Sequence, residues 1–269
     1  MEERYTLRGG QWGYDRLKVL ARAKRDDTLE LLRLAGVRPG MRCLDLGCGG
    51  GEVTFDLAAA AGPEGSVTGV DMDAEKLALA RESARERGIG NVEFRAGNVN
   101  DWDEPDAYDF VYSRFLLQHL ARPVDLLRRM WAAVRAGGVI AVEDADFDGL
   151  FCDPDNDGFD FYRTMYQEVC RRNGGDPGIG RKLYRYFGQA GLPDPQVRLA
   201  QSLAFIEDLK AISVLTLEAT ADAITGAGLA SADEVAAALA DLRAFAATRG
   251  TLIGDPRTFQ VWAERPQIS

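Results

Sequence analysis

The sequence contains a single histidine, His119, and four cysteines that show no CxxC spacing. This scarcity excludes the usual zinc-ligand patterns, so we expect no metal site and reduced thiols in a cytoplasmic protein. No apolar run approaches membrane-spanning length, and the N-terminal residues are charged where a signal peptide would be apolar. We therefore expect neither a membrane segment nor a secretion signal.

Positive charge is also scarce, because 32 Lys and Arg face 42 Asp and Glu and give a formal net charge of −10. Such a field repels phosphate backbones, and no dense Lys/Arg run offsets it, so nucleic acid is not the expected partner. With 46% hydrophobic residues, the 269-residue chain can form a full core. We expect a soluble enzyme that binds a small-molecule acceptor, and the sequence leaves a homodimer open.

Short apolar runs alternate with helical patterns over the first half of the chain. The runs cover residues 43–46, 67–70, 92–96, 110–112 and 139–142. Apolar residues at helical spacing lie between them, and Gly137-Gly138 predicts a helix-to-strand turn before the fifth run. This alternation predicts βαβ units and a parallel sheet covered by helices on both faces.

The pattern changes after Asp146. Helical stretches are expected at 161–172, 179–190 and 207–249, a strand at 196–205 and a last short strand at 258–263. Ser231 and Glu234 form a capping-box pattern. We divide the chain into an N-terminal helical lid (1–40), a cofactor-binding core (41–146) and cap insertions with the last helix and strands of the core (147–269).

Residues 44–52 read Leu-Asp-Leu-Gly-Cys-Gly-Gly-Gly-Glu, a buried strand that meets a glycine turn and then a helix. Asp71 follows at the end of the next apolar run. A bare glycine backbone lets a ligand approach closely, and a carboxylate on the neighbouring strand tip can accept two ribose hydroxyls. The two features together predict a nucleotide-type pocket.

Glu52 decides between two cofactor classes for this pocket. Counted from Gly47 and Gly49, it occupies the third glycine position of the dinucleotide pattern G-x-G-x-x-G. A carboxylate there would repel a pyrophosphate, whereas S-adenosyl-L-methionine has no phosphate. The sequence thus favours S-adenosyl-L-methionine, with a nicotinamide-dependent oxidoreductase as an alternative.

The glycine turn, Asp45 before it, Asp71 and Asn98 resemble the class I S-adenosylmethionine-dependent methyltransferases over residues 42–146. The C-terminal part fits that family loosely. The resemblance implies an α/β fold with a Rossmann-like doubly wound sheet of seven strands, the last one antiparallel. An enzyme of this fold that binds the same cofactor for a non-methylating reaction is a further alternative.

The resemblance also implies a role for each matching residue. Gly47, Cys48 and Gly49 would run under the methionyl part of the cofactor. Asp45 would act near the methionyl amino group, and the carbonyl of Arg114 would contact the same amine.

At the other end of the cofactor, Asp71 would accept both ribose hydroxyls and Met72 would lie along one adenine face. Asn98 stands where the family often has Asp, and its amide oxygen can accept the same bond from the adenine amino group. The backbone N–H of Val99 would meet a ring nitrogen.

Three side chains are candidates for the chemistry. His119 follows the fourth strand and could act as a general base, or could only bond the backbone at a helix end. Glu143 and Asp144 end the fifth strand and are expected at the open end of the sheet, although strand alternation makes it hard for both to enter one pocket. They could deprotonate an acceptor, bind a substrate amine or hold a metal, or they could be ordinary strand-end carboxylates.

The segment from Tyr5 to Trp12 combines aromatic residues with a glycine pair before the core. It suits a lid that closes over cofactor and acceptor, with Tyr5 contacting the cofactor, or an anchor on the core. Aromatic residues between 147 and 186 could line an apolar acceptor pocket. We expect methyl transfer to a small, partly apolar or aromatic metabolite.

Overall fold

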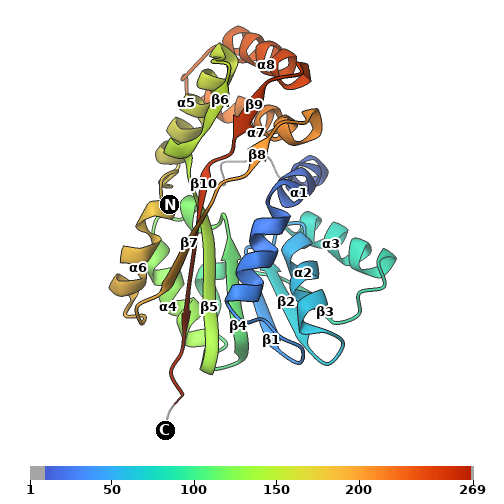
Figure 1. Ribbon diagram of the computed structural model, residues 1–269, viewed down its shortest axis with the longest axis vertical. Coiled ribbons are helices and arrows are strands. Elements are labelled where there is room, and N and C mark those ends of the chain that lie inside the picture. Colours follow the sequence, from blue (N-terminus) through green and yellow to red (C-terminus); the bar gives the residue numbers. More distant parts are fainter. Residues whose placement is uncertain (1–9, 268–269) are drawn as a thin grey trace.

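The short apolar runs become the central strands of a seven-stranded sheet in the computed structural model, which describes residues 10–267 (Figure 1). The strand order is β3-β2-β1-β4-β5-β10-β7. The strands are β1 (Arg42–Leu46), β2 (Ser66–Asp71), β3 (Val92–Ala96), β4 (Tyr108–Arg114), β5 (Val134–Asp146), β7 (Gln196–Ala200) and β10 (Arg257–Glu264). β10 runs antiparallel to both of its neighbours, which confirms the predicted Rossmann-like sheet with an antiparallel last strand.

Helices cover both faces of this sheet, as the strand–helix alternation predicted. One face carries α1 (Gly10–Leu34), α2 (Glu52–Ala61) and α3 (Ala74–Glu86), and the other carries α4 (Pro123–Ala133) and α6 (Leu183–Ala190). On β4, Phe110 and Tyr112 pack with Leu57 of α2, whereas Val111 between them packs with Leu127 of α4. Successive strand residues thus alternate between two buried faces.

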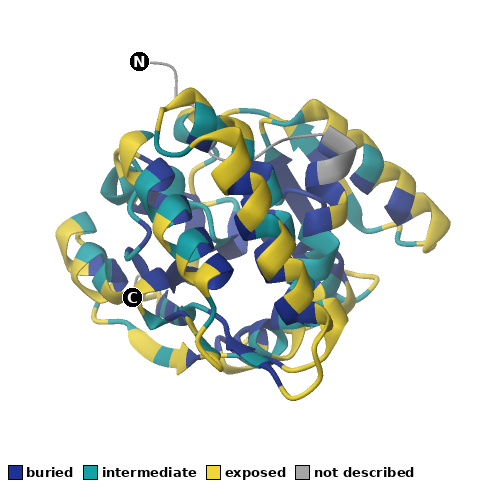
Figure 2. Ribbon diagram, turned by 90° about the horizontal axis from the view of Figure 1, so that it is seen from above, coloured by how far each residue is buried: buried dark blue, intermediate teal, exposed yellow. Residues whose placement is uncertain are grey.

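A smaller unit, here called the cap, stands above the carboxyl ends of the parallel strands (Figure 1). It contains α5 (Asp157–Arg172), α7 (Glu207–Gly226), α8 (Ala232–Ala247) and a sheet in the order β6 (Phe151–Asp153), β9 (Leu252–Gly254), β8 (Leu203–Ala204). Its own core includes Phe159, Leu217 and Leu242. Figure 2, seen from above, shows buried residues on the inward sides of the helices and exposed residues outside.

The helix α1 connects the two units, because it packs against α2 and α3 of the core and against α7 of the cap.

Several shorter features complete the fold. Short 3-10 turns occur at η1 (Val99–Asp101), η2 (Leu117–His119), η3 (Phe147–Gly149) and η4 (Gly180–Lys182). The predicted capping box at α8 is confirmed, since Ser231 and Glu234 bond each other's backbone N–H groups. Among residues 10–267, no helix is both long and apolar enough to cross a membrane.

Two predicted elements differ in the structure. The strand expected at 196–205 is split into β7 and β8, which belong to different sheets. Between them, the Gln201 amide donates 2.8 Å hydrogen bonds to the carbonyls of Gly149 and Asp255, and these bonds hold the chain where it changes sheets. The helix expected at 179–190 begins as the 3-10 turn η4 and becomes α-helical only at Leu183.

The glycine pair before the fifth run was also interpreted wrongly as a turn. β5 already begins at Val134, so Gly137 and Gly138 lie inside it. Gly137 has a φ of +75°, and the pairing of β4 with β5 shifts register between Tyr108 and Phe110. The glycines therefore form an irregularity within a long strand, as glycine in a strand often does.

Candidate active site

A cavity of about 350 Å³ opens where the carboxyl ends of β1, β2, β4 and β5 meet α1 and the cap. Its lining joins the glycine turn and Asp71 at one side to residues of α5 and α7 at the other. Crevices at the carboxyl ends of parallel strands are the usual ligand sites of doubly wound folds, and this volume lies within the range of small-molecule pockets.

The glycine turn needs glycine for its backbone and for its neighbours. Gly47, Gly49 and Gly51 have φ values of +75°, +53° and +81°, which side chains rarely tolerate. A Cβ at Gly49 would also lie 2.8 Å from the Leu17 side chain of α1, and one at Gly51 would lie 2.8 Å from Phe94. The backbone conformation and the close packing of neighbouring side chains thus both require glycine.

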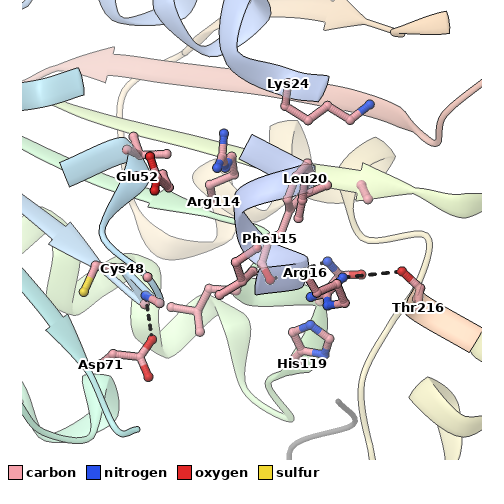
Figure 3. A pocket seen from close by; sticks show the side chains of 18 of the residues that line it. Arg16, Leu20, Lys24, Cys48, Glu52, Asp71, Arg114, Phe115, His119 and Thr216 are labelled. Atoms are coloured by element: carbon pink, nitrogen blue, oxygen red, sulfur yellow. Dashed lines mark hydrogen bonds between the residues drawn. The ribbon is translucent and has the colours of Figure 1, made fainter. Parts of the chain in front are cut away.

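Asp71 is held at the tip of β2 by two backbone amides. The N–H of Gly49 donates to its Oδ2 atom and the N–H of Asp73 donates to its Oδ1 atom, both at 2.9 Å (Figure 3). Asp71 lines the cavity, and each of its carboxylate oxygens can accept a further hydrogen bond. A pair of vicinal hydroxyls could donate to this carboxylate.

The residues after β2 and β3 complete this side of the cavity. Met72 lines it with 63% of its surface exposed, which leaves a face for a flat ring. Asn98 and Val99 also line it. The Asn98 side-chain oxygen already accepts a 2.9 Å bond from the N–H of Asn100 and has one acceptor position left.

Asp45 and Cys48 lie at the buried end of the glycine turn. The Thr54 hydroxyl donates a 2.7 Å bond to Asp45, whose pKa burial raises to about 6 against the opposing effects of Thr54 and Arg114. A cationic ligand amine beside it would favour the ionised form. Burial raises the pKa of the Cys48 thiol well above its ordinary value, so this thiol is protonated and a poor nucleophile.

The chain turns sharply into the other half of the cavity after β4. Phe115 has a φ of +53°, a left-handed conformation that is rare for an aromatic residue and often occurs at functional sites. His119 follows on η2 and also lines the cavity. Burial, together with the charges of Arg16 and Lys76, lowers its pKa to about 3, so the imidazole is neutral at neutral pH.

Glu143 does not lie where the sequence predicted. Its side chain is 1% exposed and is absent from the cavity lining. Its Oε1 atom accepts hydrogen bonds from the hydroxyls of Thr28, at 2.6 Å, and of Tyr112, and its Oε2 atom accepts from Gln260 at 2.7 Å. The carboxylate therefore points into the face that α1 covers, and it joins α1, β4, β5 and β10.

The Asp144 side chain also lies away from the cavity, because strand geometry directs it to one face of the sheet. As the next strand residue it points to the opposite face, where it accepts the backbone N–H groups of Gln118 at 3.2 Å and Ala145 at 2.8 Å. Burial raises its pKa to about 7. Like Glu143, it does not line the cavity. Both predicted catalytic carboxylates therefore make hydrogen bonds within the fold and do not face the cavity.

The structure brings together the other predicted residues it describes, since all of them line the same cavity. They are Asp45, Gly47, Cys48, Gly49, Asp71, Met72, Asn98, Val99, Arg114 and His119. Tyr5 lies outside the described residues. Arg16 and Thr216 also line the cavity, from α1 and α7, and were not predicted from the sequence. They lie 200 residues apart, so no local pattern links them.

Comparison with known proteins identifies the family. A methyltransferase domain model matches residues 38–190, more than half of the chain. The chain belongs to this methyltransferase family, as the glycine turn and its neighbours predicted. S-adenosyl-L-methionine as the cofactor is supported by this family membership.

A demethylmenaquinone methyltransferase of Listeria welshimeri is 33% identical over 137 residues, covering 49% of this chain and 57% of that protein. The chain thus spans a little over half the length of this curated relative. A provisionally assigned methyltransferase from Bacillus halodurans has a TM-score of 0.61 at 17% identity, covering 90% of this chain and 100% of that one. An S-adenosylmethionine-dependent methyltransferase from Aquifex aeolicus has a TM-score of 0.51 at 16% identity, covering 93% and 98%. These two structures share the fold.

Proposed function

We propose that this protein transfers the methyl group of S-adenosylmethionine to a small acceptor with an aromatic or apolar part. The observation that carries the proposal is the single cavity that joins the glycine turn and Asp71 to the aromatic lining of the cap. When bound, the cofactor supplies a methyl group on a sulfonium. The residues of the chain have to align that group with the acceptor and keep water away.

On the cofactor side, each assigned residue has a distinct task. Asp71 accepts the two ribose hydroxyls, and Met72 packs on the adenine. Asp45 attracts the methionyl amine, whose positive charge offsets the cost of burying the carboxylate. The backbone of Gly47 and the carbonyl of Arg114 complete the cofactor site. The fixed hydrogen bonds to Asp71 support this assignment, because they orient the carboxylate before the ligand arrives.

On the acceptor side, aromatic side chains offer a flat apolar surface. Phe147 and Tyr166 stack with ring centroids 4.3 Å apart, and both line the cavity with Phe115 and Tyr162. Such walls favour an acceptor with a ring or a flat apolar segment. This feature supports a small metabolite as the substrate.

His119 is the residue we assign to the acceptor's proton. A neutral imidazole can accept a hydrogen bond or a proton from an acceptor hydroxyl or amine. Its lowered pKa makes it a weak base, so most of the rate enhancement comes from alignment and desolvation.

The test is an assay of product formation. The purified chain is incubated with S-adenosylmethionine and a panel of small phenols, amines and aromatic acids, and S-adenosylhomocysteine is quantified by chromatography. We expect turnover with at least one acceptor class and strongly reduced turnover in Asp71→Ala. Tight cofactor binding without turnover on any acceptor would favour the non-methylating alternative.

A further inference from the structure

Arg16 is a buried cation that faces the cap side of the cavity. It is 6% exposed, and its Nη1 atom donates a long hydrogen bond of 3.4 Å to the Thr216 hydroxyl of α7. Among residues 10–267, its Nε atom has no hydrogen-bond partner and no carboxylate lies within ion-pair distance of it. The guanidinium is therefore held in place by the fold but is only partly satisfied by it.

Two other cations of the lining, Lys24 and Lys76, are paired with carboxylates. Lys24 pairs with Asp255 at 2.7 Å, with both side chains 5% exposed, and Lys76 pairs with Asp73 at 3.2 Å. Arg114 lies on the sheet side and donates to Thr28 at 3.0 Å. Around Arg16, the cap presents neutral hydroxyls.

Arg16 is also separated from the residues that we assign to the cofactor. Figure 3 shows it beyond Phe115 as seen from Cys48 and Asp71, next to His119 and Thr216. Ser213 and Thr216, which are 1% and 4% exposed, line the same end of the cavity with Tyr162. This end lies among the residues that we assign to the acceptor.

Burying a guanidinium without a counter-charge is costly, and the cost is removed when a ligand supplies the anion. The planar fork of arginine matches the two oxygens of a carboxylate. A guanidinium beside neutral hydroxyls suits a singly charged group, whereas a phosphate dianion would need further positive charge.

Resting on the proposed function, we infer that the methyl acceptor carries a carboxylate, which Arg16 binds together with the hydroxyl of Thr216. Arg16 is then a specificity-determining residue that fixes the far end of the acceptor. The aromatic or apolar part of the acceptor lies along Phe147 and Tyr166, and the reacting atom of the acceptor faces the cofactor.

The probe for this site is acetate, with acetamide as its neutral isostere. Thermal unfolding midpoints are measured against increasing acetate at constant ionic strength, with the protein free and saturated with S-adenosylhomocysteine. We expect acetate to bind both forms with a dissociation constant of about 10 mM, as its few atoms allow. Acetamide is expected to leave the midpoint unchanged.

Three variants locate the acetate. Arg16→Gln is expected to weaken acetate at least about tenfold, because it removes the charge. Arg22→Gln, which removes the same charge from an exposed position of α1, is expected to leave acetate binding unchanged. Arg16→Lys keeps the charge, and partial recovery of acetate binding in it shows that loss in Arg16→Gln does not come from misfolding.

The outcomes that overturn the inference are distinct. If acetate does not bind the wild-type protein, or binds Arg16→Gln equally well, Arg16 holds no carboxylate. If acetate binds the free protein but is displaced by S-adenosylhomocysteine, Arg16 binds the carboxylate of the cofactor. If S-adenosylhomocysteine itself does not bind, the proposed function fails, while acetate binding to the free protein still reports on Arg16.

Discussion

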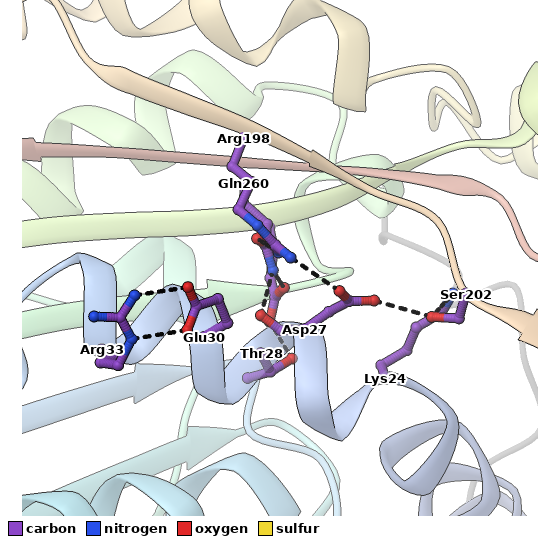
Figure 4. A network of polar contacts seen from close by, with 9 residues as sticks. Lys24, Asp27, Thr28, Glu30, Arg33, Arg198, Ser202 and Gln260 are labelled. Carbon is purple, nitrogen blue, oxygen red and sulfur yellow. Dashed lines mark hydrogen bonds and ion pairs between the residues drawn. The ribbon is translucent and has the colours of Figure 1, made fainter.

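The Thr28 hydroxyl of α1 donates a 2.6 Å hydrogen bond to the Oε1 atom of Glu143 on β5. One residue earlier on α1, Asp27 accepts bonds from Arg198 at 3.2 Å and Ser202 at 3.0 Å, and its carbonyl accepts from Gln260 at 2.9 Å (Figure 4). These contacts fasten the middle of α1 to β5, β7 and β10. The N-terminal half of the helix is thereby held over the glycine turn and the cavity.

Replacing Glu143 by Gln tests whether this carboxylate is structural. An amide presents only one acceptor oxygen to the three donors around it, so at least one buried donor is left unsatisfied. We expect the free energy of unfolding in urea to fall by about 1–3 kcal/mol. Glu30→Gln, in a more exposed ion pair with Arg33, is the control and is expected to change stability by less than about 1 kcal/mol. Unchanged stability with slowed turnover would restore Glu143 as a catalytic candidate.

Asp71→Ala tests the assignment of the cofactor site. The variant removes the acceptor of both ribose hydroxyls, so we expect the affinity for S-adenosylhomocysteine to fall by about 1–3 kcal/mol in calorimetry. Glu86→Ala, on the exposed side of α3, removes the same charge and serves as the control. Equal affinity in the wild type and Asp71→Ala would undo the assignment of this side of the cavity.

His119→Gln tests the burial of the imidazole through its effect on acid stability. The folded-state pKa of about 3 lies below the unfolded value of 6.5, so the unfolded state binds the proton first as pH falls. The stability tied to the neutral imidazole is complete above pH 6.5 and is lost on acidification toward pH 3. We expect the wild type to lose up to about 1.4 kcal/mol per pH unit relative to the variant in this window. Urea unfolding at a series of pH values measures this difference. The same pH dependence of stability in the wild type and in His119→Gln would contradict it.

The same substitution addresses the role of His119 in turnover. We expect His119→Gln to bind S-adenosylhomocysteine like the wild type and to slow methyl transfer by about tenfold or more, because a proton acceptor is lost. The rate of S-adenosylhomocysteine formation at saturating cofactor is the measurement. A variant that turns over at the full rate would remove His119 from the mechanism.

The core of the fold was predictable because its signals are local. Each parallel strand is a short buried run, and Asp45, Gly47 and Asp71 lie next to the strand ends that bring them together. Parallel strands place their carboxyl ends at one edge, so residues after neighbouring strands meet without further information. The capping box of α8 is likewise contained within four residues.

The acceptor side was not predictable for the opposite reason. Arg16 meets Thr216 across 200 residues only because α1 and α7 pack against each other. Strand alternation separates Glu143 from Asp144, but which face receives which side chain depends on the position of α1 and η2. Contacts that depend on how two units dock leave no periodic trace in the sequence.

The proposed function depends on binding of S-adenosylmethionine at the glycine turn and Asp71. Calorimetric titration of the purified protein with S-adenosylhomocysteine, with NADH titrated in parallel, measures this binding. We expect S-adenosylhomocysteine to bind at about micromolar concentration and NADH not to bind. Binding of NADH alone would contradict the proposed function and would make the protein a nicotinamide-dependent oxidoreductase.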